Sequence, residues 1–185
     1  VLTEVPPHRS TLAAELPDFP WDTIAAARAT AEEHAGGIVD LSIGTPVDPT
    51  PERAIRALSQ AANSPGYPLT SGTAALRHAI ASYLMRRWGA DGLAPDDTLP
   101  VIGTKELVAW LPTLLGLGPD DLVVYPTMAY PTYLVGAKVA GCRAIACDDL
   151  DQLGDARPAL IWINSPSNPT GQILDLETLK RRVTW

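Results

Sequence analysis

The stretch ALIWINSPSNPTGQ, residues 159–172, predicts a buried strand followed by an unusually constrained loop. Its first five residues form a continuous apolar run, which is typical of a strand covered on both faces, as in a parallel sheet. In the loop that follows, Asn168 lies between Pro166 and Pro169. Proline fixes its own φ and restricts the residue before it, so this loop would hold the Asn168 amide at one point. Taken alone, SNPTG also fits a plain turn.

Apolar segments alternate with helical segments along the rest of the chain. We expect further short strands at residues 37–46, 98–103, 121–126 and 142–147. We expect helices at residues 21–37 (with Asp22 as N-cap), 50–62, 73–89, 104–118, 131–141 and 175–183 (with Asp175 as N-cap). This alternation predicts an α/β fold, a three-layer sandwich in which helices cover both faces of a mostly parallel sheet.

Composition and charge narrow the class of protein. The 185 residues carry a net charge of −7, whereas nucleic-acid binders usually present a basic face, so no nucleic-acid partner is expected. The longest apolar stretch, residues 107–118, is too short to span a bilayer, and we expect no membrane association. Cys142 and Cys147 are too few for a disulfide framework, and the N-terminus has no signal-peptide pattern. These features favour a cytoplasmic location.

The residues that follow each expected strand are candidates for a site, because open parallel sheets bind ligands beyond the carboxyl ends of their strands. Gly103, Thr104 and Lys105 open a helix, where free N–H groups and the helix dipole favour a phosphate; a simple helix cap is the alternative. Tyr130 is either a core or turn aromatic or a flat ring on which a planar cofactor lies. There is no Walker or GxGxxG motif, and no histidine pair has the spacing of metal ligands.

Five segments in order resemble the N-terminal half of the class I/II aminotransferases. They are LSIGTP (41–46), GYPLTSGTAALRHAI (66–80), IGTKELV (102–108), AYPTY (129–133) and NSPSNPTG (164–171). The resemblance implies the large domain of the fold type I transferases, which use pyridoxal 5'-phosphate. Within this family, the segments LPDFPWDTI (16–24) and DLSIGTPVDP (40–49) are similar in sequence to those of the actinobacterial N-succinyldiaminopimelate aminotransferases.

The resemblance implies a role for each candidate residue. Asn168 would donate a hydrogen bond to the phenolic oxygen of the cofactor, from a loop whose Asn168–Pro169 bond is commonly cis in this family. Tyr130 would stack on the pyridine ring, and the backbone N–H groups of residues 103–105 would bind the phosphate. Tyr67 would reach the phosphate of the partner subunit's cofactor, which implies a homodimer. Gly44 would lie near the substrate carboxylate.

The resemblance also implies residues that the chain does not contain in the expected context. Lys105, Lys138 and Lys180 are its only lysines, and none has the context of the family's Schiff-base lysine. We therefore expect a fragment that ends before that lysine and before the substrate-binding arginine, with no catalytic residue of its own. Residues 1–45 would form an N-terminal arm and part of the small domain. Residues 46–185 would form the N-terminal part of the large cofactor-binding domain.

The activity expected of the complete protein is amino transfer from glutamate to a 2-keto acid in lysine and diaminopimelate biosynthesis. The cofactor would supply the electron sink, and the protein would supply position and charge. Two alternatives remain open from the sequence. One is another fold type I enzyme, such as a different aminotransferase or a carbon–sulfur lyase. The other is a non-catalytic truncated remnant, and the 185 residues alone are expected to be inactive.

Overall fold

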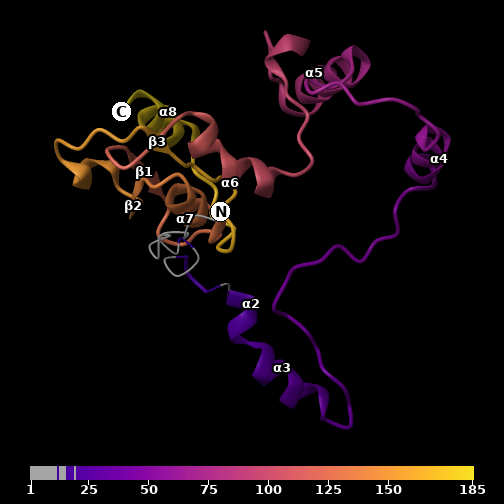
Figure 1. Ribbon diagram of the computed structural model, residues 1–185, viewed down its shortest axis with the longest axis horizontal. Coiled ribbons are helices and arrows are strands. Elements are labelled where there is room, and N and C mark those ends of the chain that lie inside the picture. Colours follow the sequence, from indigo (N-terminus) through magenta and orange to yellow (C-terminus); the bar gives the residue numbers. More distant parts are fainter. Residues whose placement is uncertain (1–11, 13–15, 19) are drawn as a thin grey trace, which may run out of the picture. The chain divides into compact units, whose positions relative to one another are not determined.

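A three-stranded parallel sheet lies within the C-terminal part of the chain (Figure 1). The computed structural model describes residues 12, 16–18 and 20–185. Strand β1 (Leu122–Tyr125) lies between β2 (Arg143–Ala146) and β3 (Leu160–Ile161), and both pairings are parallel. Three of the expected strands therefore form, and the expected parallel sheet is confirmed.

The helices lie close to the expected positions, except that the single helix expected at residues 21–37 forms as two short helices and ends at Glu32. The helices are α2 (Pro20–Thr23), α3 (Ala25–Glu32), α4 (Glu52–Ala61), α5 (Ala74–Trp88), α6 (Thr104–Leu114), α7 (Thr132–Val139) and α8 (Leu176–Thr184), with short 3-10 turns η1 (Pro95–Asp97) and η2 (Leu150–Leu153). Asp175 caps α8 as expected, because its Oδ1 accepts the N–H of Thr178 at 2.7 Å, and this bond lowers the pKa of its carboxyl. The expected N-cap role of Asp22 is wrong. The helix begins earlier, at Pro20, a residue that suits a first helical turn.

Strand β1 buries both of its faces. Val123 packs with Ala137 and Cys142 on one side of the sheet, whereas Val124 packs with Leu150 on the other. Successive strand residues point to opposite faces, so the alternation along β1 assigns α7, which carries Ala137, to one face and η2, which carries Leu150, to the other. The continuous apolar run in the sequence is thus explained by burial on two sides.

Helices α6 and α7 approach each other at Gly136. A Cβ atom at this position would lie 2.8 Å from the carbonyl oxygens of both Val108 and Ala109, and 3.1 Å from the Cα of Ala109. These are backbone atoms of α6, which cannot rotate away as a side chain does. Glycine is therefore required by packing, and the contact sets the spacing between the two helices.

The two cysteines lie at either end of β2 and differ in environment. Cys142 is buried against Val123, and this burial raises the pKa of its thiol, with a smaller contribution from the negative charge of Asp121. Cys147 is half-buried, and its Sγ lies 3.0 Å from the carbonyl oxygen of Asp149. Both cysteines are free thiols, so neither forms a disulfide that would cross-link the sheet.

The described residues form two compact units. One contains the described residues up to Ala25 together with Gly103–Trp185, and the other contains Ala26–Ile102. The strands expected at residues 37–46 and 98–103 do not form, and that part of the prediction is wrong. A strand needs a partner for its backbone groups, and no described strand pairs with either segment. Within the described residues, no helix is both long enough and apolar enough to cross a membrane.

Candidate functional site

The N-terminus of α6 is open to a ligand. Gly103 is the N-cap, with φ −170° and ψ 145°, and no side chain caps the helix there. The backbone of Gly103 is extended, which any residue adopts, and no atom lies within 4 Å of the position that a Cβ would take. Thr104 and Lys105 follow as exposed residues of the first turn. The fold therefore leaves space above N–H groups that would bind an anion, and glycine keeps this space clear.

Tyr130 lies beside this helix end. The Nζ atom of Lys105 is 5.5 Å from the centroid of the Tyr130 ring, within the range of a cation–π contact. The ring of Trp21, in α2, lies 6.0 Å from the Tyr130 ring and is tilted by 58° to it. Tyr130 is half-buried, two residues before α7 begins. The structure thus brings together two of the residues that the sequence suggested separately.

The segments that follow the carboxyl ends of the strands are linked by hydrogen bonds. The carboxylate of Asp148, which follows β2, accepts the N–H of Thr127 at 3.1 Å and also its hydroxyl hydrogen. The backbone carbonyl of Asp148 accepts a hydrogen bond from Arg182 of α8 at 2.8 Å. A pocket of about 150 Å³ opens at this edge, lined by Pro126, Asp148, Asn164, Ser167, Gln172, Leu174 and Arg182. Polar groups from the segments that follow the three strands thus line this pocket, which does not include the predicted residues 103–105 or Tyr130.

The loop after β3 is held by its own hydrogen bonds. The N–H of Gly171 donates to the Ser167 carbonyl at 2.7 Å, and the N–H of Ser167 donates to the Gln172 carbonyl at 2.8 Å. The bonds before Pro166 and Pro169 are both cis, as the resemblance implied for the second. Asn168 is exposed, and within residues 16–18 and 20–185 its side-chain amide makes no hydrogen bond. The amide is therefore available to a ligand.

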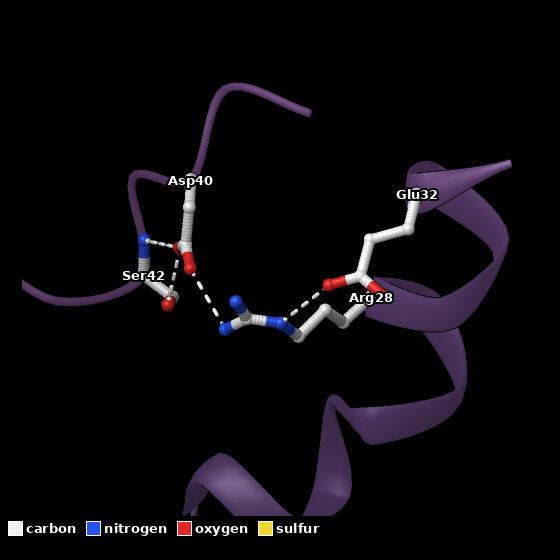
Figure 2. A network of polar contacts seen from close by, with 4 residues as sticks. All are labelled: Arg28, Glu32, Asp40 and Ser42. Carbon is white, nitrogen blue, oxygen red and sulfur yellow. Dashed lines mark hydrogen bonds and ion pairs between the residues drawn. The ribbon is translucent and has the colours of Figure 1, made fainter. Parts of the chain in front are cut away.

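The other two candidate residues, Gly44 and Tyr67, belong to the second unit. Gly44 is exposed and has no atom within 4 Å of the position of a Cβ. Tyr67 is fully exposed in the loop after α4. The segment before Gly44 is tied to α3 by a polar network (Figure 2). Arg28 bonds Glu32 at 3.0 Å and Asp40 at 2.8 Å.

Comparison with known proteins identifies the family. Residues 36–183 match the family model of the aminotransferases of class I and II. The chain belongs to this family. A probable aminotransferase of Mycobacterium tuberculosis is 56% identical over 179 residues, which cover 97% of this chain and 43% of that protein. The 4-dedimethylamino-4-oxo-anhydrotetracycline transaminase OxyQ of Streptomyces rimosus is 46% identical, over 92% of this chain and 47% of that protein.

A solved aminotransferase structure extends the comparison to the fold. It is that of a probable N-succinyldiaminopimelate aminotransferase from Thermus thermophilus, with a TM-score of 0.78 and 31% identity. The match covers 89% of this chain and 48% of that one. The fold is thus that of the class I/II aminotransferases, and the chain spans about half the length of the relatives it matches.

Members of the aminotransferase family use pyridoxal 5'-phosphate, and the residues present fit this group. The uncapped end of α6 and the open space at Gly103 suit a phosphate. The Tyr130 ring lies next to that end, as a partner for an aromatic ring would. In the described residues, no group of three or more His, Cys, Asp or Glu side chains is arranged to hold a metal ion.

Two residues that contact the candidate site residues Tyr130 and Asn168 were not among the predicted ones. Trp21 contacts Tyr130 across more than one hundred positions of sequence, and its only signal is an aromatic residue at the start of a helix. Asn164 follows the apolar run at residues 159–163, and its position after a strand is its signal in the sequence. The structure shows that it bonds the loop that carries Asn168.

We expect the titration of Asp40 to depend more on Ser42 than on Arg28. The carboxylate accepts both the Ser42 N–H, at 2.9 Å, and its hydroxyl hydrogen, at 2.6 Å (Figure 2), and these bonds are the main cause of its lowered pKa. The pKa of Asp40 in the folded protein lies below its ordinary value. The hydrogen bonds to the carboxylate are therefore fully formed at a pH above the ordinary pKa, and they are lost as the pH falls through the folded pKa. Ser42→Ala removes the hydroxyl bond, the largest single cause, and keeps the backbone N–H, so it should raise the Asp40 pKa, as measured by NMR titration of the carboxyl. An unchanged pKa would show that the hydroxyl bond does not stabilise the carboxylate.

Proposed function

We propose that the complete protein containing this chain is a pyridoxal-phosphate-dependent aminotransferase that acts on amino acids and 2-keto acids. The observation that carries the proposal is an uncapped helix N-terminus at Gly103 whose first turn carries Lys105, with its side chain in contact with the ring of Tyr130. This pairing suits a ligand with a phosphate at one end and an aromatic ring at the other. The membership of the chain in the class I/II aminotransferases supports the same assignment.

Each candidate residue has a defined task in this proposal. When bound, pyridoxal phosphate supplies an electron sink for reactions at the α-carbon of amino acids. The N–H groups of Gly103, Thr104 and Lys105 hold the phosphate, and the Tyr130 ring orients the pyridine ring. Asn168 donates a hydrogen bond to the ring oxygen and stabilises the negative charge there. No residue of this chain is assigned the covalent role.

The substrate proposed is N-succinyl-2-amino-6-ketopimelate, with glutamate as amino donor. The support is the similarity to the Thermus thermophilus protein named for N-succinyldiaminopimelate, together with the wording of residues 16–24 and 40–49. The second candidate is the amination of a larger ring ketone, favoured by the 46% identity to the Streptomyces rimosus transaminase. In both cases we propose a cytoplasmic homodimer, in which Tyr67 reaches the cofactor phosphate of the partner subunit and Gly44 lies near the substrate carboxylate.

Incubation with ¹⁵N-labelled glutamate tests the activity. The complete protein loaded with pyridoxal phosphate should transfer the label to the succinylated keto acid, as detected by mass spectrometry. Transfer to a tricyclic or tetracyclic ketone in place of the keto acid would select the second candidate. Loss of hydrogen sulfide or a thiol from a sulfur amino acid, with no label transfer to any acceptor, would contradict both.

Thr104→Pro tests the phosphate site at α6. Thr104 is the first residue of the helix, where proline is tolerated, and the extended Gly103 before it is compatible with a following proline. The substitution removes one N–H donor and leaves the helix intact. We expect about tenfold weaker binding of pyridoxal phosphate, the effect of losing one hydrogen bond to a charged group, as measured by absorbance titration.

Two controls make this binding test specific. Thr104→Ala keeps the N–H group and should bind pyridoxal phosphate more tightly than Thr104→Pro. Pyridoxal, which has no phosphate, should bind equally to Thr104→Pro and Thr104→Ala. Equal losses for the phosphorylated and unphosphorylated ligands in Thr104→Pro would place the phosphate elsewhere.

A further inference from the structure

We propose that Asn164 is a positioning residue that fixes Asn168 in the cofactor site. The side chain of Asn164 lies between two backbone groups of the same loop. Its Nδ2 donates to the Pro166 carbonyl at 3.1 Å, and its Oδ1 accepts the N–H of Asn168 at 3.0 Å. The opposite amide orientation would face oxygen with oxygen and N–H with N–H, so the hydrogen bonds assign this one.

The backbone of Asn168 is held by Asn164 in particular. The other loop bonds lie on either side of it. They join Ser167 to Gln172 and Gly171, and the Ser165 hydroxyl accepts the N–H of Leu174 at 3.0 Å. These bonds close the base of the loop and leave the Asn168 N–H to the Asn164 side chain.

Asn164 is itself well supported. It follows β3, where the N–H of Trp162 donates to the Val124 carbonyl at 2.8 Å, so its backbone is close to the last bond that joins β3 to the centre of the sheet. It is half-buried and forms part of the wall of the pocket at the strand ends, with Pro126 and Asp148. The side chain of Asn164 therefore fixes the position of Asn168, which carries the exposed amide, relative to strand β3.

This inference rests on the proposed function, because it gives Asn164 a task only if Asn168 contacts the cofactor. A small displacement of the Asn168 backbone would lengthen the hydrogen bond from its side chain to the ring oxygen. Such a bond weakens steeply with distance and angle, so the charged form of the cofactor would lose part of its stabilisation. The expected signature is thus a shift in the cofactor's pKa, in the same direction as that caused by loss of Asn168 and smaller.

The experiment is a pH titration of the bound cofactor's absorbance in the complete protein, in wild type, Asn164→Ala, Asn168→Ala and the double variant. We expect Asn164→Ala to raise the pKa by about half a unit, a roughly threefold change, as expected for one weakened hydrogen bond. The double variant should match Asn168→Ala alone, because Asn164 acts through Asn168. Ser165→Ala, which removes the bond to Leu174 at the base of the loop, should leave the pKa unchanged.

Several results would overturn the proposal. An unchanged or lowered pKa in folded Asn164→Ala would do so, as would additive shifts in the double variant or an equal shift in Ser165→Ala. Asn164→Leu, which has a similar volume and no polar atoms, should reproduce the shift of Asn164→Ala. A wild-type protein that shows no absorbance from bound cofactor would instead refute the proposed function.

A measurement on the wild type alone decides the case if the variants do not fold. The amide hydrogen of Asn168 should exchange with solvent more slowly than that of Thr170, for which no hydrogen bond is found in the described residues. Exchange of the Asn168 amide as fast as that of Thr170 would show that Asn164 does not hold it.

Discussion

Asn168→Ala is expected to raise the pKa of the bound cofactor by one to two units while the cofactor stays in place. A donor at the ring oxygen stabilises its negative charge and therefore favours release of the proton that this oxygen shares. Without the donor the proton is held more tightly, so the pKa rises. Loss of one charge-assisted hydrogen bond is worth about 1.5–3 kcal/mol, or roughly one to two pKa units.

The structure makes this a clean substitution. The Asn168 side chain is exposed and bonds no other side chain in the described part of the chain, so its removal disturbs no internal contact. Its backbone N–H, held by Asn164, remains. The phosphate contacts at α6 and the ring of Tyr130 also remain, so the cofactor should still bind. The expected loss is therefore confined to the stabilisation of charge on the cofactor.

Absorbance titrations of Asn168→Ala and wild type over a range of pH measure the effect. Thr170→Ala is the matched control in the same loop, because within the described residues its side chain makes a single hydrogen bond, from the N–H of Gln172 at 3.3 Å. Its pKa should equal that of wild type. If Asn168→Ala leaves the pKa unchanged or lowers it, Asn168 is only a turn residue.

Gly136→Ala is expected to destabilise the protein by about 2 kcal/mol. The added methyl group would meet two carbonyl oxygens of α6 at 2.8 Å, so the helices must separate. Overpacking of this kind costs about 1–3 kcal/mol. Because the contact is with backbone atoms, we expect an overpacking cost of about 3 kcal/mol, at the upper end of that range. Alanine has a helix propensity about 1 kcal/mol better than that of glycine, which offsets part of this cost. Displacement of α6 from α7 would in addition disturb the contact of Lys105 with Tyr130 and weaken cofactor binding.

Urea unfolding of the complete protein measures the change in the free energy of unfolding. Gly118→Ala is the control, because Gly118 also lies in the first unit and has no atom within 4 Å of the position of a Cβ. It should be nearly neutral in stability. Equal stability of Gly136→Ala and wild type would mean that separating the two helices costs no more than the about 1 kcal/mol that alanine gains in helix propensity.

The sequence was sufficient for the elements whose signals are local. Strands β1 and β2 are short apolar runs bounded by turn residues, and α5 begins at a threonine cap and ends at Gly89, which has φ +64°. The strands expected at residues 37–46 and 98–103 have the same local signals, yet they do not form. Apolarity alone does not specify a strand, because the backbone also needs a neighbour to pair with. Leu41 and Ile102 are accordingly exposed.

The candidate site was predictable where residues follow a strand or open a helix. The rule that ligands bind beyond strand ends selected Tyr130 and Asn168, and the helix start selected Lys105. Contacts between distant segments leave no such signal. Trp21 reaches Tyr130 only through the path of the folded chain, and Asn164 reaches Asn168 only because the loop turns back on itself. The domain boundaries and the roles of all the candidate site residues remain predictions, namely those of Gly44, Tyr67, Gly103, Thr104, Lys105, Tyr130 and Asn168.

The burial of Cys142 also has a consequence for chemical damage. Only the thiolate reacts readily with oxidants and alkylating agents, and the raised pKa keeps this thiol protonated at neutral pH. Since Cys142 is also buried against Val123 of β1 and Ala137 of α7, we expect a reagent to reach it mainly when this cluster opens. The rate at which Cys142 is modified should then depend on how often this part of the structure opens as well as on the concentration of oxidant.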